Sequence, residues 1–329
     1  MNPLPRLAAL FALSLVAPAH AADPVTVSLA GHKAMAPEIA VAPDGAIALV
    51  WVERTPEGES IAAAGAASKE GHTHLAETDL WLARSTDGGA TFSAPVRVNA
   101  QKGAVWGFPA SKPRVLVSPE GTIHFFYPGN SVVAKTGKPI VLPMYTRSTD
   151  QGRTFSEPVV LGAVPASDNS DIVKGGLANA ECFGTMTIDD RGGVYAYWID
   201  TRDMSKDVAN GKIFSAVSTD DGRTFSKDFE VFPSDACPCC QITATAANGR
   251  IYMGSRQVSA KGTRDSVVAV STDRGRTFQP RVRWGGSEWT IEGCPLKPTA
   301  LAVDGESIYA AAFDGGATPQ GAYLSRSTD

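Results

Sequence analysis

Ser85-Thr86-Asp87-Gly88-Gly89-Ala90-Thr91-Phe92 is a short string that recurs along the chain. Copies with the shared pattern Ser-x-Asp-x-Gly-x-Thr-Phe run from Ser148 to Phe155, from Ser218 to Phe225 and from Ser271 to Phe278, and a further copy begins at Ser327, where the sequence ends inside it. The first serines of successive copies are 63, 70, 53 and 56 residues apart. A repeat of this length holds one supersecondary unit and is typical of one blade of a β-propeller.

The repeated string has a structural explanation that requires no catalytic chemistry. The Ser and Asp side chains of such a turn accept hydrogen bonds from backbone N–H groups of the same turn, and the Gly occupies a position with positive φ. The Phe then packs the turn back onto the sheet. We therefore predict that these turns belong to the scaffold and not to a functional site.

Two apolar strands joined by a glycine-containing turn are predicted to open each repeat. A loop, a third strand that ends at the Ser-x-Asp turn, and a fourth strand such as Phe155 to Val160 complete an antiparallel unit. The predicted opening pairs are residues 38–42 with 47–52, 115–117 with 123–127, 185–188 with 194–198, 242–246 with 251–253, and 299–303 with 308–312.

The fold class follows from these units. No stretch has the pattern of a long amphipathic helix, so the fold is predicted to be all-β. Residues 25–29 precede the first repeat and are predicted to be the outer strand that closes the last blade, since closure removes an exposed sheet edge. Five repeats are visible, and the fifth lacks its fourth strand. We therefore expect a six-bladed propeller whose C-terminal blade is missing from this sequence.

Residues 1–21 have the pattern of a cleavable signal peptide. Arg6 supplies a positive charge, residues 7–16 are apolar, and Ala19-His20-Ala21 is a small-x-small cleavage site. The apolar run is too short to span a bilayer, and no later stretch is apolar enough for a membrane helix. The sequence thus predicts a periplasmic or secreted protein with one propeller domain at residues 22–329, truncated at its C-terminal end.

The charge of the chain disfavours a polyanionic partner. The full sequence has 30 Lys and Arg against 34 Asp and Glu, and loss of Arg6 with the signal peptide leaves 29 against 34, a formal charge of −5. Nucleic acid is therefore not an expected partner. The sequence also contains no P-loop, no Gly-x-Ser-x-Gly nucleophile turn and no His-Glu-x-x-His motif.

With its repeated Ser-x-Asp-x-Gly-x-Thr-Phe turns, the chain resembles the sialidase (neuraminidase) superfamily, whose six-bladed propellers carry such turns as Asp boxes, or BNR repeats. The likeness covers nearly all of the sequence after the signal peptide. It implies a sialidase-type propeller and, for an active member, an exo-alpha-sialidase. In that family three Arg residues hold the sugar carboxylate, and a Tyr nucleophile works with a Glu and an acid/base Asp. Bidentate guanidinium groups suit a carboxylate ligand for a general physical reason.

Only some of the family's site residues have counterparts in this chain. Arg256 stands where the family has its second Arg, at the end of the second strand of the fourth repeat. Met35-Ala36-Pro37-Glu38 replaces the first Arg, residues 320–324 lack the third, and Cys239-Cys240-Gln241 replaces the Glu. The catalytic residues are therefore unassigned, and Arg114, Arg256 and Gln241 are predicted to contact a small-molecule or glycan ligand.

All five cysteines lie where the first strands of repeats three, four and five begin, a position that faces the mouth of the channel in a propeller. These residues are Cys182, Cys237, Cys239, Cys240 and Cys294. Disulfides between neighbouring blades are one interpretation, favoured by an oxidising compartment. A soft-metal site for copper or zinc is the other, since thiolates are preferred ligands of Cu(I) and Zn(II). The odd number of cysteines leaves at least one outside any pairing within this sequence.

Two histidines are further candidate ligands. His72 and His74 form a His-x-His pair in the long loop of the first repeat, and such a pair can chelate a metal. The sequence therefore favours an exported propeller that binds a ligand or soft metal at a cysteine-rich channel mouth. The alternatives are a glycoside hydrolase of exo-alpha-sialidase type, acting on sialic acid or another sugar, and a purely structural propeller.

Overall fold

The computed structural model describes residues 23–54, 77–132, 139–163, 181–205, 207–285, 288–291, 293 and 295–328. The predicted signal peptide lies outside these ranges. Every regular element in the described residues is a β-strand, which confirms the all-β prediction. None of the described segments is a helix long and apolar enough to cross a membrane.

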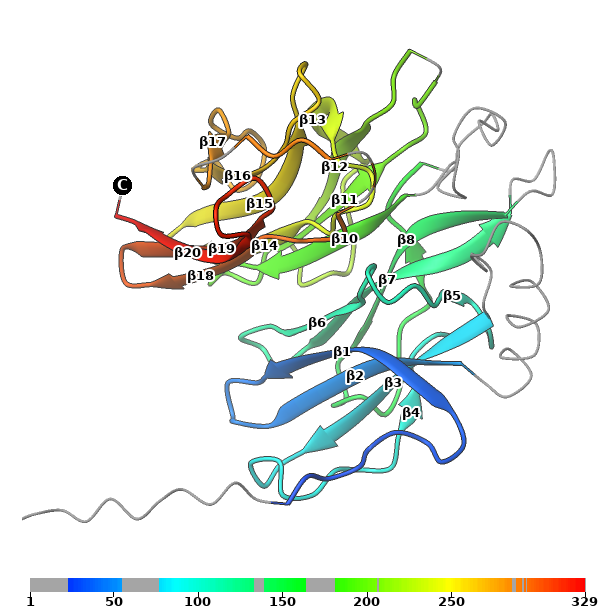
Figure 1. Cartoon of the computed structure of the whole chain (residues 1–329). Coiled ribbons are helices and arrows are strands. Elements are labelled where there is room, and N and C mark those ends of the chain that lie inside the picture. Colours follow the sequence, from blue (N-terminus) through cyan, green and yellow to red (C-terminus); the bar gives the residue numbers. More distant parts are fainter. Residues whose placement is uncertain are drawn as a thin grey trace, which may run out of the picture.

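The first two repeats form one antiparallel sheet (Figure 1). Its order is β1-β2-β3-β5-β7-β8-β9, with β4 beside β3 and β6 beside β7. The strands are β1 (Lys33–Val41), β2 (Ile47–Arg54), β3 (Glu77–Ser85), β4 (Val96–Arg97), β5 (Val105–Trp106), β6 (Arg114–Val117), β7 (Ile123–Val132), β8 (Pro139–Ser148) and β9 (Val159–Val160).

Repeats three and four form a second sheet, and the fifth repeat forms a third sheet. The second sheet has the order β10-β11-β12-β13-β15-β16-β17, with β14 beside β15, and the third has the order β18-β19-β20. The strands are β10 (Glu181–Ile188), β11 (Val194–Asp200), β12 (Gly211–Ser218), β13 (Phe229–Ala236), β14 (Thr243–Ala247), β15 (Arg250–Val258), β16 (Arg264–Ser271), β17 (Val282–Arg283), β18 (Ala300–Asp304), β19 (Ser307–Asp314) and β20 (Gly321–Ser327).

The opening strands of the five repeats follow one another side by side, as the inner strands of a propeller do. β1 contacts β6, β6 contacts β10, β10 contacts β14, and β14 contacts β18. Each predicted opening pair is present, as β1–β2, β6–β7, β10–β11, β14–β15 and β18–β19. β11 is buried along its whole length, because neighbouring blades cover both of its faces.

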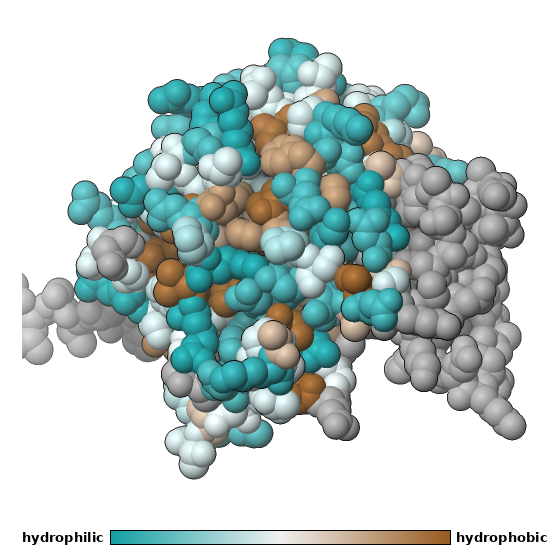
Figure 2. Space-filling view, turned by 90° about the horizontal axis from the view of Figure 1, so that it is seen from above, coloured by the Kyte–Doolittle hydropathy of each residue, from teal (hydrophilic) through white to brown (hydrophobic). Residues whose placement is uncertain are grey.

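The series of blades is open in the described residues. The three sheets do not join into a ring, and β1 and β20 belong to blades at opposite ends of the series (Figure 1). Ile39 and Val41 of β1 are 59% and 64% exposed, and Leu324 of β20 is 69% exposed. Seen from above, most of the described surface is hydrophilic, with hydrophobic residues showing between hydrophilic ones (Figure 2).

Two strand predictions are wrong. Residues 25–29 form no strand; instead the Leu29 N–H donates to Glu53 Oε1 at 2.8 Å, which ties this segment to the first blade. The fourth strand expected at residues 155–160 is reduced to Val159–Val160. Pro158 explains the late start, because proline has no N–H group to add to a strand ladder.

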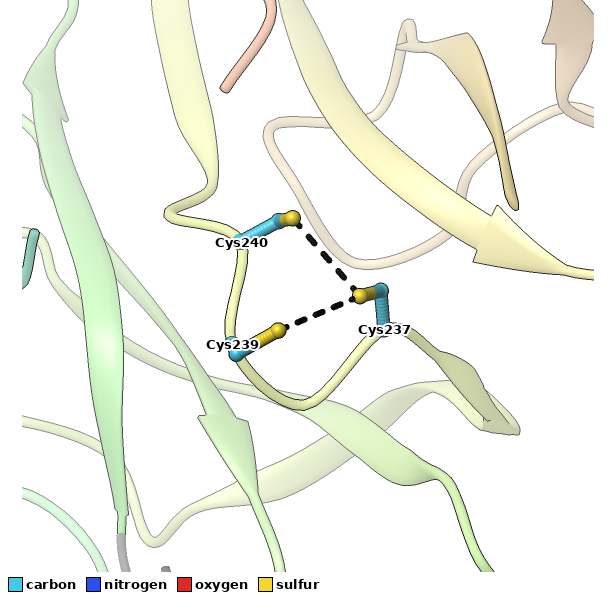
Figure 3. A group of neighbouring side chains, drawn as sticks. All are labelled: Cys237, Cys239 and Cys240. Atoms are coloured by element: carbon cyan, nitrogen blue, oxygen red, sulfur yellow. Dashed lines mark hydrogen bonds between the residues drawn. The ribbon is translucent and has the colours of Figure 1, made fainter. Parts of the chain in front are cut away.

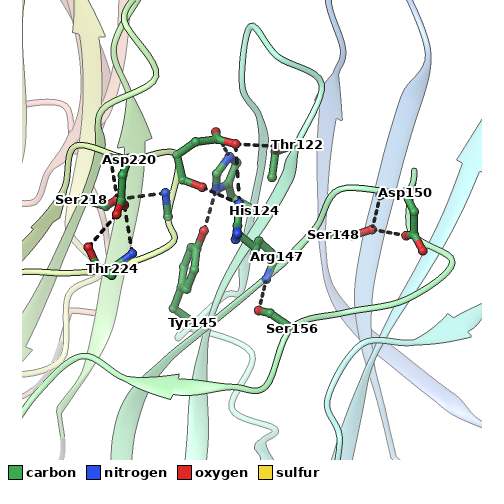
Figure 4. A network of polar contacts seen from close by, with 12 residues as sticks. Thr122, His124, Tyr145, Arg147, Ser148, Asp150, Ser156, Ser218, Asp220 and Thr224 are labelled. Atoms are coloured by element: carbon green, nitrogen blue, oxygen red, sulfur yellow. Dashed lines mark hydrogen bonds and ion pairs between the residues drawn. The ribbon is translucent and has the colours of Figure 1, made fainter.

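The repeated turns have the predicted geometry (Figure 4). In the second copy, Ser148 Oγ accepts the Gly152 N–H at 2.8 Å, and Asp150 Oδ1 accepts the Thr154 N–H at 2.9 Å. Gly152 has a φ of 84°, as expected for this position, and Gln151 has a φ of 64°. The hydroxyl of Thr154 also donates to Asp150, and this bond is the main reason that the pKa of Asp150 lies well below its ordinary value.

These turns also pack against the blade that precedes them. A Cβ added at Gly222 would overlap Tyr145 Oη of β8 in the preceding blade, and one added at Gly275 would lie 2.6 Å from Tyr197 Oη of β11. The ring of Phe225 lies 4.6 Å from that of Tyr145. The turn therefore serves as a contact between blades as well as a local fold.

A buried histidine joins the second and third blades (Figure 4). His124 of β7 has no exposed surface, its Nδ1 lies 2.7 Å from Tyr145 Oη, and its Nε2 lies 3.1 Å from Asp221 Oδ1. Asp221 also accepts a bond from Thr122 Oγ1 at 2.6 Å, and Arg147 Nη1 donates to the Asp221 carbonyl at 3.1 Å. Burial lowers the pKa of His124 from 6.5 to about 4, so the imidazole is neutral at pH 7.

Candidate functional site

The connection between β13 and β14 is held in place by backbone hydrogen bonds at both ends. Ala236, the last residue of β13, pairs with Gln257 of β15, so the third blade continues onto the fourth. Cys237 N–H then donates to Arg256 O at 2.8 Å, and Ile242 N–H donates to Phe183 O at 2.8 Å. This short connection positions three cysteine side chains.

The sulfur atoms of Cys237, Cys239 and Cys240 lie together, and the three side chains point toward one another (Figure 3). Cys237 Sγ lies 3.6 Å from Cys239 Sγ and 3.6 Å from Cys240 Sγ, and all three atoms are within 4.8 Å of one another. The exposed fractions are 0%, 2% and 1%. Among the described cysteines there is no disulfide. We call these three residues the cysteine cluster.

Nitrogen–hydrogen donors surround the cysteine cluster. Arg264 of β16 donates from Nη1 to Cys237 Sγ at 3.1 Å. The backbone N–H of Cys239 also donates to Cys237, and that of Lys297 donates to Cys240. Hydrogen bonding with Cys239 and Cys240 lowers the pKa of Cys237 far below its ordinary value, and hydrogen bonding with Cys237 raises the pKa of Cys240. The cluster is thus suited to hold negative charge on sulfur.

The structure brings together three of the five cysteines predicted to converge. Cys182 is buried in the same apolar core, with Trp106 and Phe183, but its sulfur is not part of the three-atom group. Cys294, His72 and His74 lie outside the described residues. Their predicted roles as ligands or disulfide partners therefore stay predictions.

Arg256 is buried and its guanidinium group is fully engaged. Only 3% of the residue is exposed. Nη1 donates to Arg264 O, Nη2 donates to Lys297 O at 3.2 Å and to Phe313 O at 3.1 Å, and the group lies 5.1 Å from the ring centre of Trp289. These contacts connect the fourth blade to the fifth. The predicted contact of Arg256 with a ligand carboxylate stays a prediction.

Gln241 and Arg114 also have partners within the protein. Gln241 Nε2 donates to Lys112 O at 3.1 Å and to Gly184 O at 3.0 Å, and Oε1 accepts the Lys112 N–H at 3.3 Å. The side chain therefore links the second, third and fourth blades. Arg114 forms an ion pair with Glu38 of the first blade, and burial raises the pKa of Glu38 in spite of that arginine.

Arg264 is the residue of this site that the sequence did not reveal. Arg264 is the first residue of β16, the third strand of its blade. It pairs with Val258, the last residue of β15, and therefore lies at the same end of the sheet as the last residue of β13. The one signal in the sequence that could have pointed to Arg264 was its position at the start of the third strand of its repeat. Its Nε is buried and has no hydrogen-bond partner among the described residues.

Arg264 also lines a surface depression. Its lining includes Arg256, Arg264, Asp265, Arg283 and Trp289. Arg264 thus contacts a sulfur of the cysteine cluster and also borders a depression that opens to solvent.

Both the sequence and the fold are similar to those of known proteins. Residues 61–319 match the BNR repeat-like domain family. No curated protein matches the chain. Among solved structures, the fold is similar to a protein of unknown function from Dyadobacter fermentans DSM 18053, with 16% identity, a TM-score of 0.56 and coverage of 90% of this chain and 79% of the other.

Two enzymes of known activity share the fold at lower similarity. The GH93 alpha-L-arabinofuranosidase of Fusarium graminearum is 14% identical, with a TM-score of 0.51 and coverage of 92% of this chain and 95% of that enzyme. The leech intramolecular trans-sialidase is 11% identical, with a TM-score of 0.50, and the match covers 92% of this chain but 63% of the enzyme. At these identities the likeness concerns the fold alone. The resemblance to the sialidase superfamily is confirmed, and the chain belongs to the BNR repeat-like domain family.

Proposed function

We propose that this protein is an exported member of the sialidase superfamily that binds a soft metal ion through Cys237, Cys239 and Cys240. The observation that carries the proposal is the convergence of three buried sulfur atoms within 4.8 Å. Thiolates are the preferred ligands of Cu(I) and among the preferred ligands of Zn(II).

The spacing of the sulfur atoms fits a metal complex. A metal–sulfur bond of about 2.3 Å places sulfur atoms about 3.8 Å apart in tetrahedral and about 4.0 Å apart in trigonal coordination. Two of the three sulfur pairs lie at 3.6 Å. Small side-chain rotations would therefore suffice to admit an ion, and the backbone bonds of Cys237 and Ile242 would keep their places.

Export and a six-bladed ring are part of the same proposal. Residues 1–21 support export by their pattern. The exposed apolar residues at the ends of the series, Ile39 and Val41 on β1 and Leu324 on β20, support a further blade between those ends, because such a blade would cover them. The mass of the mature protein recovered from the periplasm of a bacterial host would test cleavage before Ala22.

Metal binding is tested with purified full-length protein under reducing, oxygen-free conditions. We expect one equivalent of Cu(I) or Zn(II) to remain bound after gel filtration, as measured by atomic mass spectrometry, and we expect Cys237→Ser to abolish this binding. Ala236→Ser is the matched control, because it places the same hydroxyl group in the same buried segment and removes no sulfur.

A disulfide within the cluster is the competing outcome. Mass spectrometry after alkylation counts the thiols of protein prepared without reductant. A complete set of oxidised cysteines, together with no metal uptake after reduction, would reject the proposal. The glycosidase alternative has no support from Arg256, because that guanidinium group is occupied by backbone carbonyls.

A further inference from the structure

The cysteine cluster offers three donor atoms and a closed environment. Among the described residues, no His, Asp or Glu joins the three sulfur atoms as a potential ligand. The exposed fractions of 0%, 2% and 1% also separate the three sulfur atoms from bulk water, which would be another source of a fourth ligand. Zinc in proteins is almost always four-coordinate, whereas Cu(I) is a soft ion that is stable with three thiolates.

A buried trithiolate complex of Cu(I) would carry a net charge of −2, since three thiolate charges oppose one positive charge. Burial of such a charge is costly unless cationic or hydrogen-bonding groups compensate it. Arg264 meets this need at Cys237, with Nη1 3.1 Å from Sγ, and the backbone N–H groups of Cys239 and Lys297 add two further donors.

We propose that the cysteine cluster is a three-sulfur Cu(I) site and that Arg264 is its positioning residue. This inference rests on the metal binding proposed above. Arg264 holds the Cys237 sulfur toward the other two and compensates the charge of the complex. The buried Nε of Arg264, which has no partner among the described residues, leaves the side chain free of a competing bond at that atom.

The test is an oxygen-free Cu(I) titration of the reduced full-length protein against the chromogenic chelator bathocuproine disulfonate. X-ray absorption of the copper-loaded protein then counts the sulfur neighbours, and a parallel titration uses Zn(II) alone. We expect tighter retention of Cu(I) than of Zn(II) and three sulfur neighbours. Cys294→Ser is expected to leave both results unchanged.

Variants of Arg264 test its role. Arg264→Met, which keeps an unbranched apolar stem and removes the guanidinium group with its charge, should weaken Cu(I) binding about 10- to 100-fold, the range typical for loss of a group that supports a metal ligand. Arg264→Lys should recover part of this loss, because it restores the charge. Arg283→Met is the control, since Arg283 borders the same depression, is 44% exposed in its side chain and pairs with Glu288. The thiolate-to-copper absorption band reports on the site itself, and circular dichroism shows whether each variant is folded.

The outcomes separate the two proposals. Four sulfur neighbours, or tighter binding of Zn(II), would overturn the Cu(I) inference and leave the metal-binding proposal standing. Absence of binding by either ion would overturn both. Equal Cu(I) affinity for wild-type protein and for folded Arg264→Met would overturn the role of Arg264. If Arg264→Met does not fold, Arg264→Lys and Arg264→Gln replace it. Wild-type affinity and an unchanged absorption band in both of these variants would then overturn the role of Arg264.

Discussion

Acidification should weaken the junction between the second and third blades through His124. The folded protein holds the pKa of His124 at about 4, mainly because the imidazole is buried, whereas an exposed histidine has a value of 6.5. As the pH falls, the unfolded chain therefore binds a proton before the folded protein does. The stabilisation is fully present above pH 6.5 and is lost as the pH falls from there toward 4.

The size of the effect follows from these two pKa values. A difference of one unit corresponds to about 1.4 kcal/mol, and integration from pH 7 to pH 5 gives a loss of about 2 kcal/mol from this one residue. The Asp-box carboxyl groups act in another pH range, since the hydroxyl of Thr154 helps to hold the pKa of Asp150 below 3.8.

Urea unfolding at pH 7, 6 and 5 measures this loss. His124→Gln is the comparison, because glutamine can bond to Tyr145 and Asp221 and does not titrate. We expect the free energy of unfolding of the variant to fall by about 2 kcal/mol less than that of the wild-type protein over this range. The same dependence on pH in both proteins would refute the assignment of the effect to His124.

Three further predictions concern packing and buried polar contacts. Gly222→Ala should destabilise the protein by about 3 kcal/mol or more in urea unfolding, because the added methyl group overlaps Tyr145 Oη. Gly121→Ala is the control, since Gly121 also has a positive φ but open space around it, and it should cost only about 1 to 2 kcal/mol. Gln241→Leu should cost about 2 kcal/mol by the same assay, since it leaves buried carbonyl groups of two other blades without donors, and an unchanged stability would show that water replaces the amide. Arg256→Ala should lower the melting temperature, and if the protein hydrolyses an aryl sialoside, turnover measured at a temperature where the variant is folded shows whether Arg256 also contacts substrate.

The sequence was sufficient for the paired opening strands of each repeat and for the internal geometry of the turns. Five opening pairs could be placed because each repeat has two apolar segments around a turn, and burial of both faces makes such segments strongly apolar, as in β11. The position of Gly152 in the left-handed region followed from its place in the repeated string. Features within one repeat are local, and local patterns specify them.

Contacts that depend on tertiary packing could not be predicted from the sequence pattern of one repeat. The contact of Gly222 with Tyr145 depends on how two blades pack, and nothing in either segment alone indicates it. Arg264 reaches Cys237 across 27 residues of sequence, and this contact too depends on tertiary packing that no local pattern specifies. Residues 25–29 were assigned to a strand on the expectation of ring closure, while the bond from Leu29 to Glu53 places them elsewhere.

The docking of the later Asp-box turns onto the blade before them limits how such a protein can diversify. The turn of the third repeat fits Tyr145 of the second, and the turn of the fourth fits Tyr197 of the third. A recombination event that exchanged one complete sequence repeat would separate a turn from the tyrosine that receives it. Tyr145 and Gly222 are 77 residues apart in sequence, and Tyr197 and Gly275 are 78 apart, so each pair spans more than one repeat. A viable exchange would therefore have to transfer two neighbouring repeats together, or insert a repeat whose turn already fits the tyrosine of its new neighbour.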